Sequence, residues 1–144
     1  MNIDVPNISI YQQLKNRSLE NNYKDNVALE YFGTKITFGE FFKNIDKTAR
    51  ALRSQGVRRG DVVTVLSANT PEAIYSFYAL NKIGAVANMV HPLSAENEIK
   101  HYLNISRTEW FITVDFTMDK VDKILDETKV KIDINEDGTV FIYG

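Results

Sequence analysis

One segment near the end of the chain carries the residue spacing of a calcium-binding loop. In DINEDG, Asp133, Asn135, Asp137 and Gly138 stand where an EF-hand loop places its first ligands and its glycine. The last ligand position of such a loop holds Gly144 instead of the glutamate that binds calcium through both oxygens. Asn, Asp and Gly are also typical turn residues, so we predict a hairpin turn here and no metal site.

The two histidines, His91 and His101, are the next residues with chemical potential. They are too few for a convincing zinc site, and no nucleophile or paired carboxylate accompanies them in the sequence. His91 follows an apolar segment at the point where open α/β sheets bind ligands. His91 is therefore the candidate for a residue close to a ligand, and a structural role in the strand-to-loop joint is the alternative.

Three further polar residues have both a functional and a structural interpretation. Asp61 could be a catalytic carboxylate, but a side chain that accepts backbone N–H groups in a tight turn explains it without a partner acid or base. Asn69 and Thr70 could contact a ligand, although loop and N-cap roles already explain them. The seven glycines form neither GxGxxG nor GxxxxGK[ST]. We therefore assign no catalytic, cofactor-binding or metal-binding residue to this chain.

The elements that position these residues centre on the segment 56–92. Residues 62–66 are apolar and rich in valine, which predicts a buried strand. Thr70 caps the following helix, Pro71 occupies its first position, and Gly84 ends it. Residues 85–90 then form a second apolar strand. A strand, a helix and a strand in this order predict a parallel crossover.

The segments before this unit predict two helices and a hairpin. Two capping boxes are expected, Ser9 with Gln12 and Thr37 with Glu40. A hairpin is predicted around the two-residue turn Gly33-Thr34. The helix after Thr37 has an apolar stripe and ends at Gly56, with Val57 placed for a Schellman motif.

After this unit, the sequence again predicts helices and strands in alternation. Ser94 is expected to cap a helix whose inward face includes Tyr102, and residues 110–114 form a third apolar strand. Residues 120–128 predict one more helix. Residues 130–134 and 139–143 predict a terminal hairpin. The fold class is therefore α/β, a three-layer unit with a mainly parallel sheet flanked by helices and small antiparallel hairpins near both ends.

Composition bounds the function of the chain. Its 144 residues suffice for one domain, and the net charge of −2 argues against a nucleic-acid partner. The chain has no cysteine, which excludes disulfides and thiolate chemistry. We expect a cytoplasmic protein with no membrane span, because the sequence shows neither a secretion signal nor a long apolar run.

Taken together, these residues resemble the N-terminal region of the AMP-forming acyl-CoA synthetases, which belong to the adenylate-forming ligase superfamily. The resemblance covers residues 10–131 and rests on the order and spacing of ITFGEF, ALRSQGVRRGD, NTPE and NKIGAV. The matching positions that we regard as structural are Thr37, Glu40, Gly56, Gly60, Asp61, Asn69, Glu72, Gly84 and Pro92.

The resemblance implies a parent ligase that uses ATP, Mg²⁺ and coenzyme A to activate a fatty acid or another carboxylic acid. This chain would be its single N-terminal subdomain, with the ATP-binding subdomain and the C-terminal domain of the parent as partners. The phosphate loop, the ribose-binding segment and the catalytic lysine of the family have no counterpart in this sequence. The chain alone is therefore expected to be inactive and to hold no cofactor. We expect residues 132–144 to depart from the family pattern.

Two alternatives remain open at this point. The chain is either a catalytically incomplete fragment of the ligase or a stand-alone binding or dimerisation module derived from the same fold. A less favoured alternative is an unrelated doubly wound domain, for which the acidic cluster of a receiver is missing. Exposed apolar surface left by a missing partner would favour association into a homo-oligomer.

Overall fold

Three parallel strands form the sheet on which the rest of the chain packs. In the computed structural model, which describes residues 6–128, β3 (Val62–Leu66) lies between β4 (Val86–Val90) and β5 (Trp110–Thr113). Both neighbours run parallel to β3. The parallel arrangement predicted from the three apolar segments is confirmed.

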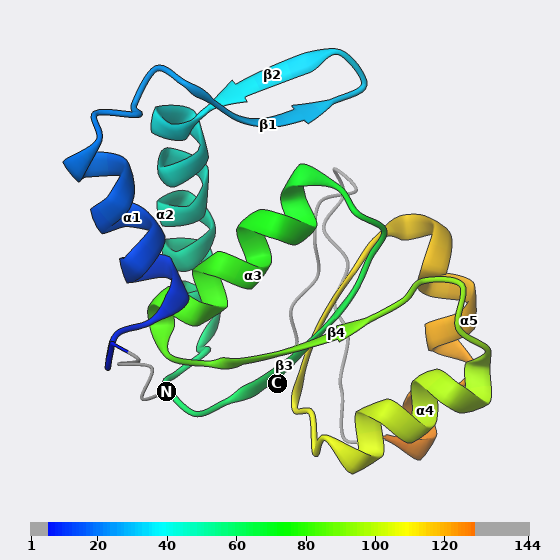
Figure 1. The fold of residues 1–144 in the computed structure, drawn as a ribbon. Coiled ribbons are helices and arrows are strands. Elements are labelled where there is room, and N and C mark those ends of the chain that lie inside the picture. The colour runs from blue at the N-terminus through cyan, green and yellow to red at the C-terminus, as the bar shows by residue number, and fades with distance from the viewer. Residues whose placement is uncertain (1–5, 129–144) are drawn as a thin grey trace, which may run out of the picture.

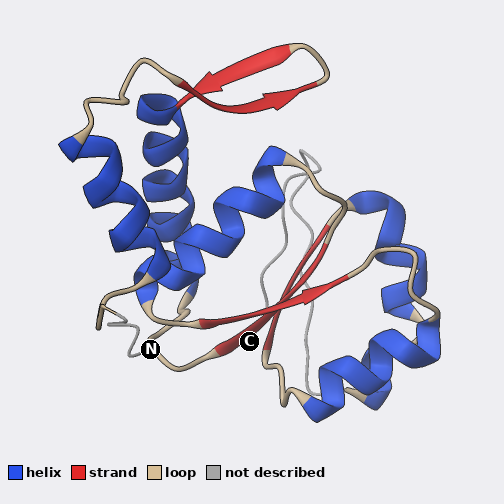
Figure 2. Ribbon diagram, in the orientation of Figure 1, coloured by secondary structure: helices blue, strands red, loops and turns tan. Residues whose placement is uncertain are grey.

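Helices cover both faces of this sheet, and a hairpin stands beside them (Figures 1 and 2). These elements are α1 (Ile10–Glu20), β1 (Val27–Tyr31), β2 (Thr34–Thr37), α2 (Phe38–Gln55), α3 (Pro71–Ile83), α4 (Glu96–Ile105) and α5 (Met118–Asp122). Figure 1 shows α1, α2 and α3 on one side of the sheet and α4 and α5 on the other.

The side chains of the central strand, β3, point alternately to the two faces of the sheet. Val63 and Val65 belong to the apolar cluster with α1, α2 and α3, whereas Leu66 belongs to the cluster with α4 and α5. Side chains of a strand alternate between faces, so a strand buried on both sides has to be apolar at successive positions. This explains the continuous apolar segment and confirms the three-layer α/β class.

The ends of α2 follow the sequence signals closely. The Thr37 hydroxyl accepts the Glu40 N–H at 3.3 Å, and the Glu40 carboxylate accepts the Thr37 N–H at 2.9 Å. At the other end, Gly56 has a φ of 115°, and the Val57 N–H donates to the Leu52 carbonyl at 3.1 Å. The capping box and the Schellman motif are therefore both confirmed.

The hairpin turn and the first capping box differ from the prediction. The turn is Phe32-Gly33 instead of Gly33-Thr34, because Tyr31 pairs with Thr34. Both turn residues have positive φ, 47° and 81°, as a two-residue hairpin turn requires. Phe32 therefore adopts a conformation that its side chain disfavours. At α1, Ser9 accepts the Gln12 N–H, but the Gln12 side chain donates to Asn16, so only half of the box forms.

Three predictions after Pro92 are also corrected. The N-cap of α4 is Ala95 and not Ser94, and Glu98 takes over the capping by accepting the Ala95 N–H at 2.9 Å. Tyr102 is exposed instead of facing inward. The single helix predicted for residues 120–128 is replaced by α5 and by 3-10 turns at 115–117 and 125–127. The predicted terminal hairpin and the DINEDG segment lie outside the described residues.

A polar cluster ties the three helices of one face together. Asp46 of α2 accepts hydrogen bonds from Lys82 of α3 at 2.5 Å and from the Tyr11 hydroxyl of α1 at 3.1 Å. Partial burial would raise the pKa of Asp46, but the hydrogen bonds from Lys82 and Tyr11 outweigh it and hold the pKa below its usual value. The cluster therefore stabilises the ionised carboxylate in the folded protein.

We expect Gly56→Ala to lower the free energy of unfolding by about 2 kcal/mol. Alanine disfavours a positive φ by roughly 1–2 kcal/mol, and its Cβ would lie 3.1 Å from the Trp110 ring. Gly33→Ala is the control, because Gly33 also has a positive φ but open space around it. For Gly33→Ala, urea unfolding should show a loss of about 1 kcal/mol in the free energy of unfolding, from the positive φ alone. Equal losses for the two variants would contradict the contact with Trp110.

We expect Asp46→Asn to lower the free energy of unfolding by about 1 kcal/mol near pH 7. Hydrogen bonds to a charged group contribute somewhat more than this when buried, and the partial exposure of Asp46 reduces the contribution. The folded-state pKa of Asp46 is depressed, so its contribution is complete above the unfolded pKa of about 3.9 and disappears as pH falls through the lower folded pKa. Urea unfolding at about pH 7 and about pH 3 measures the difference between the two proteins.

Glu127→Gln is the matched control for this experiment. Glu127 pairs with Lys100 at 2.8 Å, but its side chain is 61% exposed. Glu127→Gln should therefore lower the free energy of unfolding by less than Asp46→Asn does. A difference between the wild-type protein and Asp46→Asn that grows in acid would refute the role assigned to Asp46.

Candidate functional site

The carboxyl ends of the three parallel strands lie at one edge of the sheet. Leu66 of β3 pairs with Val90 of β4 and with Thr113 of β5, so the strands end together. Open α/β sheets bind ligands at this edge, where the loops that leave the strands form a crevice. His91 follows β4 directly and Asn69 is the third residue after β3, so the structure brings both to this edge.

His91 presents its imidazole at the surface of this edge. Its Nδ1 atom accepts the Leu93 N–H at 3.2 Å, which leaves the Nε2 atom to carry the proton of the neutral ring. Pro92 is buried, and its carbonyl accepts a hydrogen bond from Lys120 at 3.3 Å. The loop that follows the exposed ring is thus anchored, and Nε2 makes no hydrogen bond to any residue in the range 6–128.

Asn69 lines a small cavity at the same edge, about 270 Å³ in volume. The loop 67–69, one side of α3 and Met89 of β4 enclose it. Thr70 does not line this cavity; its hydroxyl accepts the Ala73 N–H at 3.3 Å and caps α3. Asn69 is therefore the ligand-contact candidate that lines a cavity, and its side chain makes no hydrogen bond to another residue of the described range 6–128.

Gly60, Asp61 and Gly84 lie at the opposite edge of the sheet. The Asp61 carboxylate accepts the Arg58 N–H at 2.7 Å, and the Gly60 N–H donates to the Gly84 carbonyl at 3.0 Å. Five residues of β3 separate Asp61 from the carboxyl edge, which is about 16 Å of strand. Asp61 thus has the turn role that the sequence suggested and does not join His91 and Asn69.

The other positions of interest belong to helix ends. The backbone N–H and the hydroxyl of Thr37 hold the pKa of Glu40 below its usual value. Glu72 lies in the first turn of α3, where the helix dipole favours a negative charge. Within residues 6–128, no three carboxylate, imidazole or thiol side chains gather as a metal site would need.

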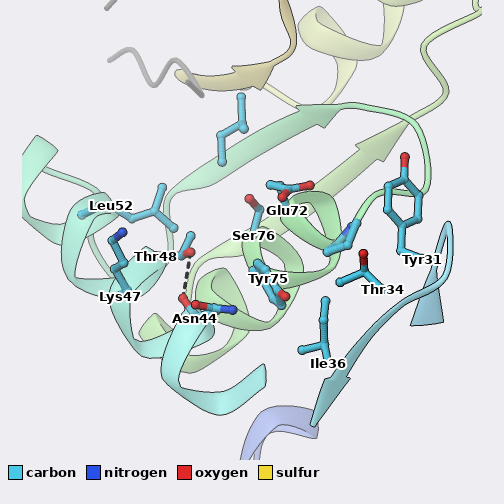
Figure 3. A pocket seen from close by; sticks show the side chains of 13 residues that line it. Tyr31, Thr34, Ile36, Asn44, Lys47, Thr48, Leu52, Glu72, Tyr75 and Ser76 are labelled. Carbon is cyan, nitrogen blue, oxygen red and sulfur yellow. Dashed lines mark hydrogen bonds between the residues drawn. The ribbon is translucent and has the colours of Figure 1, made fainter. Parts of the chain in front are cut away.

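Sequence reasoning missed a second, larger cavity, which has a volume of about 650 Å³ (Figure 3). It lies between α2, the first turns of α3, the hairpin and Ile112 of β5. Its lining comes from four segments that are far apart in the chain. Periodicity marks the apolar members only as core residues, so no local signal distinguishes this cavity.

None of the helices between residues 6 and 128 combines the length and the apolar character that crossing a bilayer requires.

Comparisons with known proteins give a consistent picture. The family model described as "AMP-binding enzyme" matches residues 16–141. The long-chain-fatty-acid–CoA ligase of Bacillus subtilis (strain 168) is 28% identical over 102 residues, which cover 71% of this chain and 18% of that protein. The acetyl-coenzyme A synthetase of Shewanella sp. (strain MR-4) is 37% identical over 99 residues, covering 65% of this chain and 15% of that one. The chain thus spans less than a fifth of these relatives.

Solved structures agree in fold. The N-terminal subdomain of Klebsiella oxytoca NpsA superposes with a TM-score of 0.69 and 27% identity, over 74% of this chain and 27% of that chain. A long-chain-fatty-acid-CoA ligase (FadD1) from Archaeoglobus fulgidus gives a TM-score of 0.79 at 21% identity, over 90% of this chain and 27% of the other, and supports the fold alone. Because the family model covers most of the sequence, the chain belongs to the family of AMP-binding enzymes.

Proposed function

We propose that this chain forms the N-terminal part of an ATP-dependent, AMP-forming acyl-CoA ligase and serves there as a scaffold. The observation that carries the proposal is the family match over residues 16–141, together with relatives named as CoA ligases or synthetases. The solved N-terminal subdomain of NpsA supports the placement at the start of a larger enzyme.

The proposed reaction activates a carboxylic acid in two steps. The carboxylate attacks the α-phosphorus of ATP and releases pyrophosphate, which gives an acyl-adenylate. The thiol of coenzyme A then displaces AMP and forms the thioester. A carboxylate is a poor electrophile, and AMP supplies the leaving group that it lacks. ATP, Mg²⁺ and coenzyme A would be bound by the complete ligase, which would act in the cytoplasm where these cofactors are supplied.

We propose the carboxyl edge of the sheet as the surface of this chain that faces the rest of the ligase. Leu93 is 75% exposed, Phe116 65% and Met89 47%, and each lies in or just after β4 or β5. Apolar side chains gathered at one edge are typical of an interaction surface. His91 and Asn69 lie at the same edge, so they are the residues of this chain proposed to come closest to bound substrate.

ATP–pyrophosphate exchange tests the proposal. The 144-residue chain, assayed alone with acetate, octanoate and palmitate, should give no carboxylate-dependent exchange. The longest reading frame that contains the chain in its genome, expressed in full, should give clear exchange with one of these acids. Circular dichroism of the chain alone is the control that it is folded.

Two results would contradict the proposal. Carboxylate-dependent exchange by the 144-residue chain alone would refute the scaffold role. A natural stop codon after residue 144, with no ligase segment encoded downstream, would instead favour the stand-alone module.

A further inference from the structure

β4 forms one border of the parallel sheet and is the most exposed of its three strands (Figure 1). Val86 is 52% exposed and Met89 47%, whereas three of the four residues of β5, at the other border, are buried. Among the strands within residues 6–128, only β3 pairs with β4. The outer side of β4, which faces away from β3, is therefore a sheet edge without a strand partner in the described part of the chain.

Two residues of β4 direct their backbone groups to this outer side. The Val86 N–H donates to the Asp61 carbonyl at 2.8 Å, so the backbone groups of Val86 face β3. Backbone groups along a strand alternate in direction, so those of Ala87 and Met89 face outward. Neither of these two residues forms an outward backbone hydrogen bond to a residue in the range 6–128. The outer side of β4 thus presents two N–H and two C=O groups that another strand could pair with.

Edge strands usually carry features that prevent pairing with another chain, such as charged side chains, proline or a bulge. The hairpin has such features, since Glu30 and Lys35 lie on its strands and its register is irregular between Val27 and Leu29. β4 reads VANMV, with neither charge nor proline, and its register with β3 is continuous over all five residues. Of these two exposed elements, β4 is therefore the one suited to pairing.

The sequence of β4 is complementary to itself in an antiparallel arrangement. With Asn88 opposite its own copy, Ala87 lies opposite the partner's Met89, and Val86 lies opposite the partner's Val90. The outward N–H and C=O groups then form about four hydrogen bonds, since each of the two Ala87–Met89 pairs exchanges two. The small Ala87 side chain leaves room for the long Met89 side chain, and β4 brings no like charges together because it contains none.

The side-chain contacts of Asn88 hold β4 in place for such pairing. The Asn88 amide donates to the Thr64 hydroxyl at 2.9 Å and to the Ser106 hydroxyl at 3.2 Å, which ties β4 to β3 and to the end of α4. Ile105, beside Ser106, is 69% exposed and extends the apolar surface next to the strand. A strand that is already fixed loses little conformational entropy when it pairs.

We propose that two copies of this chain associate through the outer sides of β4, antiparallel about a two-fold axis at Asn88. The two three-stranded sheets then become one continuous sheet. A two-fold interface uses the same surface on both copies and closes, so it gives a dimer and no filament. Because an interface of one strand per copy is small, we expect a dissociation constant of about 10–100 µM. This association does not rest on the proposed ligase function.

Sedimentation equilibrium of the 144-residue chain between about 5 and about 500 µM tests the proposal and should fit a monomer–dimer equilibrium. Val86→Lys should weaken the dimer by at least about 10-fold, because symmetry places two lysines against an apolar strand. Leu93→Lys is the matched control, since Leu93 is 75% exposed but lies beyond β4, and it should leave the dimer unchanged. Circular dichroism and urea unfolding should show that both variants fold.

Amide hydrogen exchange measured by NMR locates the interface. The Ala87 and Met89 amide protons should exchange about 3-fold more slowly at about 500 µM than at about 20 µM, because the fraction of monomer falls with concentration. The Val86 amide, which already donates to Asp61, is the internal control and should change little.

A single monomeric species up to about 500 µM would overturn the proposal, since the expected dissociation constant lies below that concentration. Equal weakening in Val86→Lys and Leu93→Lys would overturn it as well. A dimer without added protection at Ala87 and Met89 would place the interface elsewhere. Protection that does not depend on concentration would show pairing within one copy, and either result contradicts association through β4. All of these outcomes leave the proposed ligase role untouched, since pyrophosphate exchange measures a different property.

Discussion

The burial of α3 is the constraint on which the rest of this structure depends. The helix packs against α1, α2 and the sheet, and Ala79 and Leu80 in its middle are completely buried. A helix enclosed in this way has to be apolar around most of its circumference, and its ends have to be fixed by local signals. Thr70 and Pro71 fix the start, and Gly84 with a φ of 86° fixes the end. The direction and spacing of β3 and β4 follow from these two ends.

The elements that the sequence predicted well are those whose stability is local or strongly periodic. The capping box of Thr37 and the stripe of α2 involve residues within a few turns, and the strands were recognised from continuous apolar composition. The errors occur where tertiary contacts override local preference. Phe32 is placed in a left-handed turn conformation because the register of β1 and β2 demands it, and Glu98 caps α4 in place of a serine side chain.

The candidate sites were less predictable than the fold. His91 and Asn69 could be placed at the carboxyl edge because topology alone determines where strands end. The larger cavity combines one face of α2, the start of α3, the hairpin and Ile112, and its existence depends on how these elements are spaced in three dimensions. Lys47 and Ser76 belong to no motif, so the chain alone offers no sign that they share a cavity.

The residues that carry the family resemblance explain why relatives with different substrates match the same segment. Gly56 and Gly84 end helices, Thr37 and Glu40 begin one, and Asp61 closes a turn. These are requirements of backbone geometry and remain the same whichever acid an enzyme activates. The relatives named as a long-chain-fatty-acid–CoA ligase and as an acetyl-coenzyme A synthetase both match here. Similarity in this region therefore reports the shared fold and does not distinguish relatives that are named for different acyl groups.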